Sequence, residues 1–397
     1  MTEHLPDVAP ERIDVDGVAV VSWTDAQGCR RAALDRCPHR RAPLSSGTVH
    51  DGVLRCAYHG WAYAGDGSCV DIPALGPDAR IPARAHLDMV EGDTAPEDRT
   101  GVGGKDKAAW LDGDTDGLEH FWHAVVRQHE VAPGVKTDAQ LLGRMWTVAR
   151  DAGGALTATR DDGVVAAAVT EHLDHVWVSP EPPRAPLPDV AEWGADGWYH
   201  RRLSRAEGRL GVGLLLDNQL DAAHFAFVHA ATFGRREAAF LPPAEIDQHD
   251  TVATQILRVP IAARNDPQAG DARPVEQHRT MHYEFHAPLW LRLQLDYEEL
   301  GGSTIILFAF VPLAAGLARM DVDMLFAHPD GFTAEQLDER MEFEEQVVGE
   351  DVALQLLFDD LRLPLDPSAE LHTKADRYSL VCRELIRRLL DEVIVAT

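Results

Sequence analysis

Residues 37–61 read CPHRRAPLSSGTVHDGVLRCAYHGW, and this stretch decides the fold that we expect for the chain. It holds two of the five cysteines, and a histidine follows each of them closely. Cys37 and His39 form a C-x-H pair, and Cys56 and His59 form a C-x-x-H pair. Spacings this short let one tight loop present both side chains to the same centre. The segment therefore predicts a site built from two thiolates and two imidazoles.

Two kinds of site use that set of ligands. One is a structural zinc site of the Cys2His2 type, and the other is a Rieske [2Fe-2S] cluster, in which the cysteines hold one iron and the histidines the other. A zinc finger would continue into a helix that carries the histidines. The text DGVLRCAYHGWAYAGDGSCV instead alternates and is rich in turn residues, which predicts a β-hairpin. This pattern favours the cluster.

The wider motif string closely resembles the Rieske family. CPHR, APLS, the pattern L-x-C-x-YHGW-x-Y and IPA follow one another in the order that the family uses. Ala57 departs from the proline that is often found there, and Arg41 departs from a more usual small residue. Neither side chain is a ligand in the family, so the expected cluster ligands remain Cys37, His39, Cys56 and His59.

Composition excludes several other classes of function. The 397 residues carry a formal net charge of -28, which disfavours binding to nucleic acid or to an anionic membrane surface. The opening MTEHLPDVAPERID lacks the apolar stretch of a signal peptide, and the longest apolar run, TIILFAFVPLAAGLA, contains a proline and is too short to span a bilayer. We therefore expect a cytoplasmic protein in which five cysteines do not form a disulfide framework.

A second cluster of candidate ligands lies in residues 217–229, which read DNQLDAAHFAFVH. On a regular helix, His224 and His229 would point about 140° apart, so they can share a metal only if the helix ends or bulges between them. Asp221 and His224 lie three residues apart and share one face. The alternative interpretation is a buried amphipathic helix with two core histidines.

Downstream of a Rieske pattern, the spacing N-x-x-D-x-x-H-x4-H resembles the catalytic segment of the Rieske non-heme iron oxygenases. Asn218, Asp221, His224 and His229 all match it. The resemblance implies that the two histidines and one distant carboxylate bind Fe(II) and leave positions open for dioxygen. It also implies that Asp221 links His59 of the cluster to His224 of the iron site. Otherwise, Asp221 is an acidic residue on a helix surface.

The third iron ligand is expected from the acidic C-terminal region, which we predict to be helical, then extended, then helical. Sequence alone does not choose among its acidic residues. The resemblance does, because the family places its ligand at the aspartate of an ED pair, which here is Asp351. Glu350 and Glu345 are the alternatives.

The order of the segments departs from the family pattern. Residues 121–163 resemble the usual opening of a Rieske domain, but no CPHR follows them, and the cluster loops have already appeared. Because residues 16–37 parallel residues 142–163, we favour an internal repeat over an insertion at residues 88–168. In chain order, we expect a Rieske [2Fe-2S] domain at 1–90, a linker at 91–117, a Rieske-like unit without cluster ligands at 118–195, and a catalytic mononuclear iron domain at 196–397.

The expected fold class is α+β, with small all-β Rieske domains and a catalytic domain in which helices wrap an antiparallel sheet. The resemblance implies an oxygenase that oxidises a small apolar aromatic or heterocyclic substrate by mono-oxygenation, demethylation or oxidative cyclisation. Its electrons would come from NAD(P)H through a ferredoxin or flavin reductase, since the chain shows no flavin or nicotinamide fingerprint.

The family commonly forms homotrimers in which one subunit's cluster serves its neighbour's iron, so a homotrimer is expected here as well. A relocated cluster unit could instead serve the iron of its own chain. The alternative function is a Rieske electron carrier or redox sensor without catalytic iron, which would have no need for the second set of ligands. A zinc-stabilised binding module is the third possibility.

Overall fold

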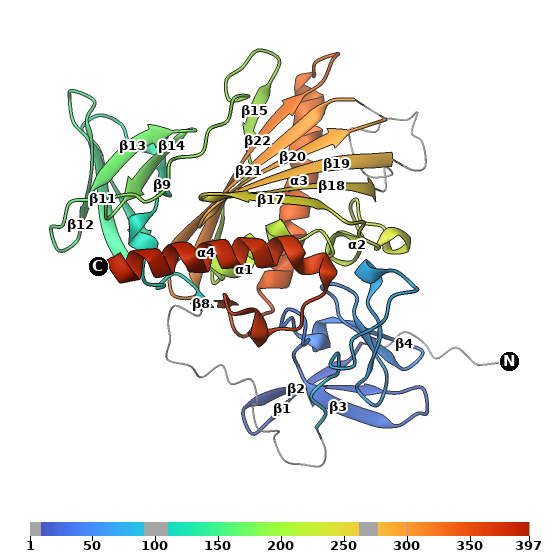
Figure 1. The fold of residues 1–397 in the computed structure, drawn as a ribbon. Coiled ribbons are helices and arrows are strands. Elements are labelled where there is room, and N and C mark those ends of the chain that lie inside the picture. Colours follow the sequence, from blue (N-terminus) through green and yellow to red (C-terminus); the bar gives the residue numbers. More distant parts are fainter. Residues whose placement is uncertain (1–8, 91–109, 262–276, 300, 397) are drawn as a thin grey trace.

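The computed structural model describes residues 9–90, 110–261, 277–299 and 301–396. Two small β-rich parts lie at opposite ends of the molecule, with a large sheet and its helices between them (Figure 1). The N-terminal part is drawn in blue, the second small part in green, and the large sheet in yellow to orange. The predicted α+β class is confirmed, because the sheets are antiparallel and the long helices are grouped against the large one.

The N-terminal part consists of two small antiparallel sheets. Their strands are β1 (Glu11–Val15), β2 (Val18–Thr24) and β3 (Arg30–Leu34) in the first sheet, and β4 (Thr48–His50), β5 (Val53–Arg55), β6 (Ala62–Tyr63) and β7 (Cys69–Asp71) in the second. Asp-Gly pairs with positive φ at both residues connect β1 to β2 and β4 to β5. Such pairs favour the tight turns of hairpins, so these two connections are encoded locally.

The second small part contains six strands, which form two three-stranded sheets. They are β9 (His123–Arg127), β10 (Lys136–Leu141), β11 (Arg144–Arg150), β12 (Leu156–Arg160), β13 (Ala168–His172) and β14 (His175–Ser179). The meander β10–β11–β12 matches β1–β2–β3 in order, and its second and third strands have the same lengths, seven and five residues. β14 pairs with β13 and β9, and none of the described strands before residue 90 joins them.

The central sheet has eight antiparallel strands in the order β15-β22-β21-β20-β19-β18-β17, with β16 paired to β22. The strands are β15 (Tyr199–Arg202), β16 (Ala206–Gly208), β17 (Glu245–His249), β18 (Val252–Ile261), β19 (Gln277–His286), β20 (Trp290–Tyr297), β21 (Ser303–Ala314) and β22 (Leu317–Ala327).

Both faces of this sheet are buried, which explains the nearly continuous apolar run in β21. Ile306 and Phe308 point into the core shared with the helices, whereas Ile305 and Leu307 point into the core shared with the second small part. Successive residues of a strand face opposite sides, so one apolar strand can serve two cores. The second small part therefore covers one face, and the other face is left for the helices and the metal sites.

Four α-helices accompany the sheet: α1 (Val212–Leu220), α2 (Phe225–Val228), α3 (Ala334–Gln355) and α4 (Arg377–Ala396). The predicted succession of helix, extended segment and helix at the C-terminus is present, with the short strand β23 (Leu363–Pro364) between α3 and α4. Thr333 caps α3 by accepting a hydrogen bond from the backbone of Gln336. Among the described helices, none is both long enough and apolar enough to cross a membrane.

The expected linker at 91–117 is only partly covered by the structure, because residues 91–109 lie outside the described part. Residues 110–117 lie inside the described part. They begin with β8 (Trp110–Leu111), which pairs with β23, and both of its side chains are buried. The partner strand lies far along the chain, so this pairing could not be predicted from local composition.

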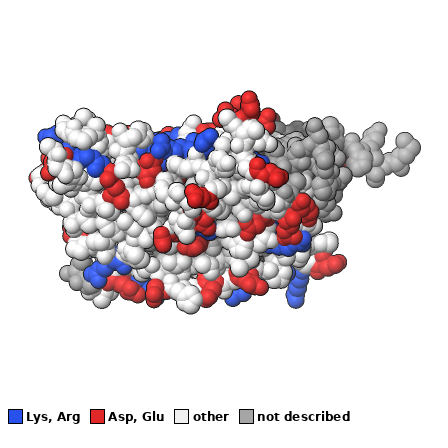
Figure 2. Space-filling view, turned by 90° about the horizontal axis from the view of Figure 1, so that it is seen from above, with Lys and Arg blue, Asp and Glu red and all other residues white. Residues whose placement is uncertain are grey.

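Acidic side chains are spread across the face shown in Figure 2, and basic side chains interrupt them in smaller groups. This distribution agrees with the strongly negative net charge of the sequence.

Candidate metal centres

The two predicted cluster loops, at residues 37–42 and 56–61, have the same backbone construction. The fourth residue after each cysteine donates its N–H to the cysteine carbonyl, from Arg41 to Cys37 and from Gly60 to Cys56. The cysteine N–H groups close the loops: Cys37 donates to the carbonyl of Ala42, and Cys56 donates to the carbonyl of Trp61. Both fourth residues have positive φ, 59° at Arg41 and 68° at Gly60. A left-handed residue is therefore needed at this point of each loop.

The loops bring Cys37, His39, Cys56 and His59 together, each at most 3% exposed. The imidazole rings of His39 and His59 lie edge to face with their centroids 4.5 Å apart. His39 stacks on Trp61, and Nδ1 of His39 is buried without a hydrogen-bond partner among the described residues. An orphaned buried nitrogen beside two thiols is what a site for a metal cluster requires, so the residues fit the group.

The surroundings of the two thiols shift their pKa values in opposite directions. Burial opposes ionisation of Cys37, but hydrogen bonds from Cys56 and Tyr63 outweigh it and lower the pKa of Cys37 to about 7. The hydrogen bond to Cys37 and burial both raise the pKa of Cys56. Binding of a metal requires both groups as thiolates, so it would release at least the proton held on Cys56.

The imidazole of His59 reaches out of the cluster loop to a carboxylate of the catalytic part. Its Nε2 is in direct hydrogen-bond contact with Oδ2 of Asp221, which caps the C-terminus of α1. The same oxygen lies 3.8 Å from Nδ1 of His224. Burial acts to raise the pKa of Asp221, but the charge of His59 and the hydrogen bonds of His224 and His59 together outweigh it and hold that pKa well below its usual range. Asp221 is thus an ionised carboxylate placed between the two predicted sites.

A second buried carboxylate holds the other predicted cluster histidine. Nε2 of His39 lies 2.7 Å from Oδ1 of Asp376, which sits just before α4. Burial acts to raise the pKa of Asp376, but the charges of His39 and Arg40 reverse that effect and lower the pKa. Both imidazoles therefore present Nε2 to a carboxylate and keep Nδ1 for the centre, an arrangement that fixes ring orientation in metal sites. Nothing in the sequence pointed to Asp376.

A network of buried charges seats the cluster loop on the catalytic part of its own chain. Arg40 lies 2.9 Å from Asp376, 3.2 Å from Asp217 and 3.5 Å from Glu370. Arg383 on α4 completes the network with contacts of 2.8 Å to Asp217 and to Glu370. All of these side chains are at most 6% exposed. Removing one member of the network would leave the remaining charges buried with fewer partners, which is strongly unfavourable.

Steric fit strengthens the same contact. A Cβ at Gly60 would lie 2.0 Å from the ring of Phe227, so the loop and α2 touch closely. Phe227 therefore packs on the cluster loop.

Arg41, the departure from the small residue expected in this family, contacts Glu370 and Asp360 and packs over Trp110. These contacts compensate for its left-handed backbone.

The helix that carries the second predicted site is interrupted before His224 and ends again just before His229. α1 ends at Leu220, Asp221 is extended, and a new single-turn helix, α2, begins after His224 and ends before His229. His229 lies just past the end of α2, outside helical geometry, and both imidazoles face the same side. Their Nε2 atoms lie 3.2 Å apart.

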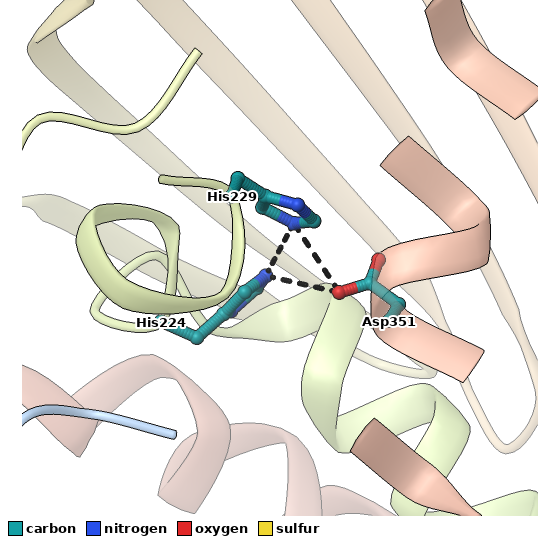
Figure 3. A group of neighbouring side chains, drawn as sticks. All are labelled: His224, His229 and Asp351. Carbon is teal, nitrogen blue, oxygen red and sulfur yellow. Dashed lines mark hydrogen bonds and ion pairs between the residues drawn. The ribbon is translucent and has the colours of Figure 1, made fainter. Parts of the chain in front are cut away.

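Asp351 comes from the last turns of α3 and completes a triangle with His224 and His229 (Figure 3). Its Oδ1 lies 3.5 Å from Nε2 of His224 and 3.2 Å from Nε2 of His229, and it has no hydrogen-bond partner among the described residues. Three ligands at right angles around one ion, with bonds of about 2.1 Å, would be roughly 3 Å apart. The donor set therefore fits a single metal ion.

The alternative acids have other partners. Oε2 of Glu350 lies 2.8 Å from Nδ1 of His229, and Glu345 accepts a hydrogen bond from the backbone of Ser204. Burial acts to lower the pKa of His229, but the charges of Asp351 and Glu350 outweigh it and raise that pKa to about 9. Glu350 thus holds Nδ1 of His229 and orients the ring so that Nε2 faces Asp351, as carboxylates commonly do for metal-bound imidazoles.

Asn218, matched by the motif, lies one turn before Asp221 and is 1% exposed. Its Oδ1 accepts a hydrogen bond from the hydroxyl of Tyr58, and its Nδ2 has no partner among the described residues. The ring of Tyr58 contacts His59, with centroids 3.9 Å apart. Asn218 therefore positions an aromatic residue at the junction of the two sites, a contact that the sequence did not reveal.

A cavity opens beside the triangle of His224, His229 and Asp351. Most of its wall is apolar and comes from Phe225, Phe233, Leu203, Leu293, Leu295, Ile306, Phe308, Phe343, Val347 and Val348. Phe225, next to the ligand His224, lines the cavity, and Phe227 does not. Arg279, Gln219 and Glu344 supply the remaining polar lining.

Two family models match the chain on either side of the second small part. The Rieske [2Fe-2S] domain model matches residues 1–87, and the model of the vanillate O-demethylase oxygenase C-terminal domain matches residues 211–392. The first contains every predicted cluster ligand, and the second contains every predicted iron ligand. The chain thus combines a Rieske domain with a segment similar to the C-terminal domain of vanillate O-demethylase oxygenases. The chain belongs to the Rieske non-heme iron oxygenase family.

Curated relatives match over short segments. Protein TIC 55, chloroplastic, from Arabidopsis thaliana is 45% identical over 91 residues, which is 23% of this chain and 17% of that protein. Methylxanthine N1-demethylase NdmA from Pseudomonas putida is 49% identical over 60 residues, which is 15% of this chain and 17% of that protein. The chain therefore aligns with less than a fifth of the length of these relatives.

Among solved structures, NdmA of Pseudomonas putida CBB5 with caffeine aligns with 96% of this chain and 85% of its own length. The TM-score is 0.46 and the identity is 17%.

Proposed function

We propose that this chain is the oxygenase component of a system that uses dioxygen and electrons from a separate reductase or ferredoxin to oxidise a small, largely apolar substrate. The reaction would be a mono-oxygenation, a demethylation or an oxidative cyclisation, and the substrate aromatic or heterocyclic. The apolar cavity beside His224, His229 and Asp351 supports this class of substrate.

In this proposal Cys37 and Cys56 hold one iron of a [2Fe-2S] cluster and His39 and His59 hold the other. His224, His229 and Asp351 hold a single Fe(II) ion. When bound, the cluster stores one electron and the Fe(II) ion supplies the chemistry that activates dioxygen.

The observation that carries the proposal is the contact of Asp221 with both predicted sites within one chain. Asp221 accepts a hydrogen bond from His59 Nε2–H, which fixes the tautomer that presents Nδ1 to the cluster. The buried position of Asp221, 6% exposed, keeps water out of the junction. Tyr58, bonded to Asn218, fills the remaining space between His59 and His224. An electron carrier would have no use for this connection.

The partners follow from the same proposal. Electrons originate from NAD(P)H in a flavin reductase, with or without a ferredoxin between them, and reach the cluster of this chain. The homotrimer implied by the family remains a prediction, although His59 meets the bridging carboxylate without a neighbouring subunit. A cytoplasmic location also remains a prediction, which is compatible with five cysteines that form no disulfide.

We further propose that residues 118–195 are a second Rieske-like unit that lacks cluster ligands. The equal lengths of the paired strands in the two meanders and their common order support a repeat. The pairing of β14 with β9 argues against an insertion into one domain, because the closing strands would then join the N-terminal sheets. In this division the cluster domain is 1–90 and the catalytic domain 196–397.

The test is a count of iron and acid-labile sulfide on anaerobically purified, iron-loaded protein. We expect about three irons and two sulfides per chain, since the cluster contains two of each. His224→Ala should lose one iron and keep both sulfides and the colour of the cluster. As a control, His123→Ala removes a buried histidine that bonds a backbone carbonyl far from both sites and should keep all three irons. Two irons in the loaded wild-type protein would support the electron carrier instead.

A further inference from the structure

The N-terminal part, which holds the predicted cluster ligands, contacts the part that holds the predicted iron ligands within one chain. His59, on the second cluster loop, bonds Asp221. Pro38, on the first cluster loop, accepts a hydrogen bond of 2.8 Å at its carbonyl from the backbone N–H of Leu371. Each cluster loop is therefore bonded directly to the catalytic part.

Buried charges at the centre of this contact are complementary across it. Arg40 comes from the N-terminal part and is 4% exposed. Its carboxylate partners, Asp217, Glu370 and Asp376, all come from the catalytic part, and no described acid of residues 9–90 pairs with it. Complementary charges fix how two surfaces meet, so the contact favours one orientation of the cluster loops.

The course of the chain allows this contact to form without a second subunit. The described N-terminal part ends at Val90, whose N–H bonds the carbonyl of Ala32 on β3. The chain is described again from Trp110, and the guanidinium of Arg41 on the first cluster loop lies over its ring, 5.4 Å from the centroid.

The covalent connection is long enough for that path. The roughly 20 peptide units between Val90 and Trp110 can span up to about 70 Å. A domain of about 90 residues has a radius of gyration of only about 12 Å. The catalytic part therefore resumes beside the cluster loop of its own chain, and the connection imposes no need for a neighbour.

The route between the two predicted sites in this arrangement is short and dry. One carboxylate, Asp221, and two imidazole rings, His59 and His224, separate the sites. The ring of Tyr58 lies beside the route, with its centroid 3.9 Å from that of His59 and 6.1 Å from that of His224. All four side chains are at most 6% exposed, so bulk water does not interrupt the route.

We propose that each chain is a complete electron-transfer unit, in which the cluster of the N-terminal part reduces the iron site of the same chain. In that step the cluster loses one electron, the iron site with its dioxygen gains it, and the reductase or ferredoxin reduces the cluster again. Arg40 is the positioning residue that orients the cluster loops on the catalytic part. A homotrimer is compatible with this inference if each subunit uses its own cluster.

This inference rests on the proposed function and specifies which cluster serves which iron. It differs from the expectation given by the family resemblance, in which the cluster of one subunit serves the iron of its neighbour.

The test measures magnetic coupling between the two sites and does not require turnover. Protein with a reduced cluster receives Co(II), which is paramagnetic, or Zn(II), which is not, at His224, His229 and Asp351. A nearby paramagnetic ion speeds the relaxation of the cluster's EPR signal, and this effect falls steeply with distance. We expect faster relaxation with Co(II) than with Zn(II), and the same difference in protein diluted until sedimentation shows single chains. A wild-type protein without this difference, or a difference that is lost in single chains, would overturn the proposal.

Mixed chains assign the coupling to one chain or to two. Cys56→Ser removes the cluster and keeps the iron ligands, whereas His224→Ala impairs the metal site and keeps the cluster. The two variants are co-expressed with different tags, and protein that carries both tags is purified. We expect its cluster signal to relax equally with Co(II) and Zn(II), because no chain holds both centres. Faster relaxation with Co(II) in this mixture would contradict the inference.

Two further results of the mixing experiment are also decisive. If no doubly tagged protein is recovered, the chains do not associate, and the coupling of the wild-type protein then lies within one chain. If thermal unfolding shows that Cys56→Ser is not folded, Cys37→Ser takes its place, and the measurement on single wild-type chains needs no variant.

A variant of Arg40 tests its positioning role. Arg40→Gln should reduce the Co(II) effect by about twofold or more, since three buried carboxylates would be left with fewer cations to hold the loop. Arg40→Lys should retain part of the effect. The matched control Arg127→Gln removes another buried guanidinium, paired with Asp323 outside this contact, and should retain all of it. Arg40→Gln protein with full cluster and cobalt content and unchanged coupling would contradict the positioning role.

Failure of the oxygenase proposal is distinguishable from failure of this inference. A chain without oxygenase activity could still show coupling within one chain, and an active oxygenase could show coupling in the mixed chains.

Discussion

Binding of iron should compete with one proton on His229. The charges of Asp351 and Glu350 outweigh burial and raise the pKa of His229 to about 9, whereas burial lowers the pKa of His224. Asp351 is ionised throughout, because nearby His229 and His224 hold its pKa at about 2 despite its burial. In the metal-free site at pH 7, His229 is therefore the one ligand of the three that must lose a proton before its Nε2 can bind.

The size of the effect follows from the distance between pH 7 and that pKa. Two pH units correspond to about 2.7 kcal/mol, or a 100-fold weaker apparent affinity at pH 7 than above pH 9. The affinity for Fe(II) should rise with pH, because the raised pKa favours protonated His229 and the metal needs the neutral imidazole. The apparent affinity for Fe(II) should rise about tenfold for each pH unit between 7 and 9, with the release of about one proton per ion near pH 7.

The assay is an anaerobic competition between cluster-loaded protein and a chromophoric Fe(II) chelator, calibrated at each pH between 6.5 and 8.0. Glu350→Gln removes one of the charges that raise the pKa of His229, so that pKa should fall. The Fe(II) affinity of this variant should therefore stop rising at a lower pH than that of the wild-type protein. Glu345→Gln is the matched control, because Glu345 bonds Ser204 instead. A wild-type affinity that changes less than threefold over this range, with no proton release, would refute the reasoning.

Three further predictions concern the junction between the sites. Asp221→Asn should keep both metals but nearly abolish coupled product formation; steady-state turnover equal to that of the wild type would exclude the bridging role. Gly60→Ala should destabilise the cluster loop by about 1–3 kcal/mol in urea unfolding, because its Cβ would meet the Phe227 ring 2.0 Å away, and Phe227→Ala should restore part of that loss. An unchanged unfolding midpoint in the single variant would contradict the close contact. Asp217→Asn should lower the free energy of unfolding by about 3–5 kcal/mol, since it leaves Arg40 and Arg383 buried beside fewer carboxylates. A decrease below about 1 kcal/mol would show that the network does not hold the cluster loop.

The sequence by itself determined the features that depend on short separations. The pairs Cys37–His39 and Cys56–His59 lie on tight loops because each spacing spans a single turn of backbone. An end of the helix just before His229 could also be inferred, since a regular helix cannot turn residues five apart to one side. The choice of Asp351 needed the resemblance, because several acids of α3 were equivalent on local grounds.

Only the tertiary structure decided the contacts that join distant segments. Asp376 lies 337 residues from His39, and nothing in the local text of either residue identifies the other. The pairing of β8 with β23, which replaced part of an expected linker, has the same origin. Arg279 sits on an ordinary alternating strand, so its place in the cavity wall with His229 became visible only when the surrounding elements were in place. Local spacing fixes which atoms can share a loop, whereas charge pairing depends on which buried surfaces meet, and that is a property of the whole packed chain.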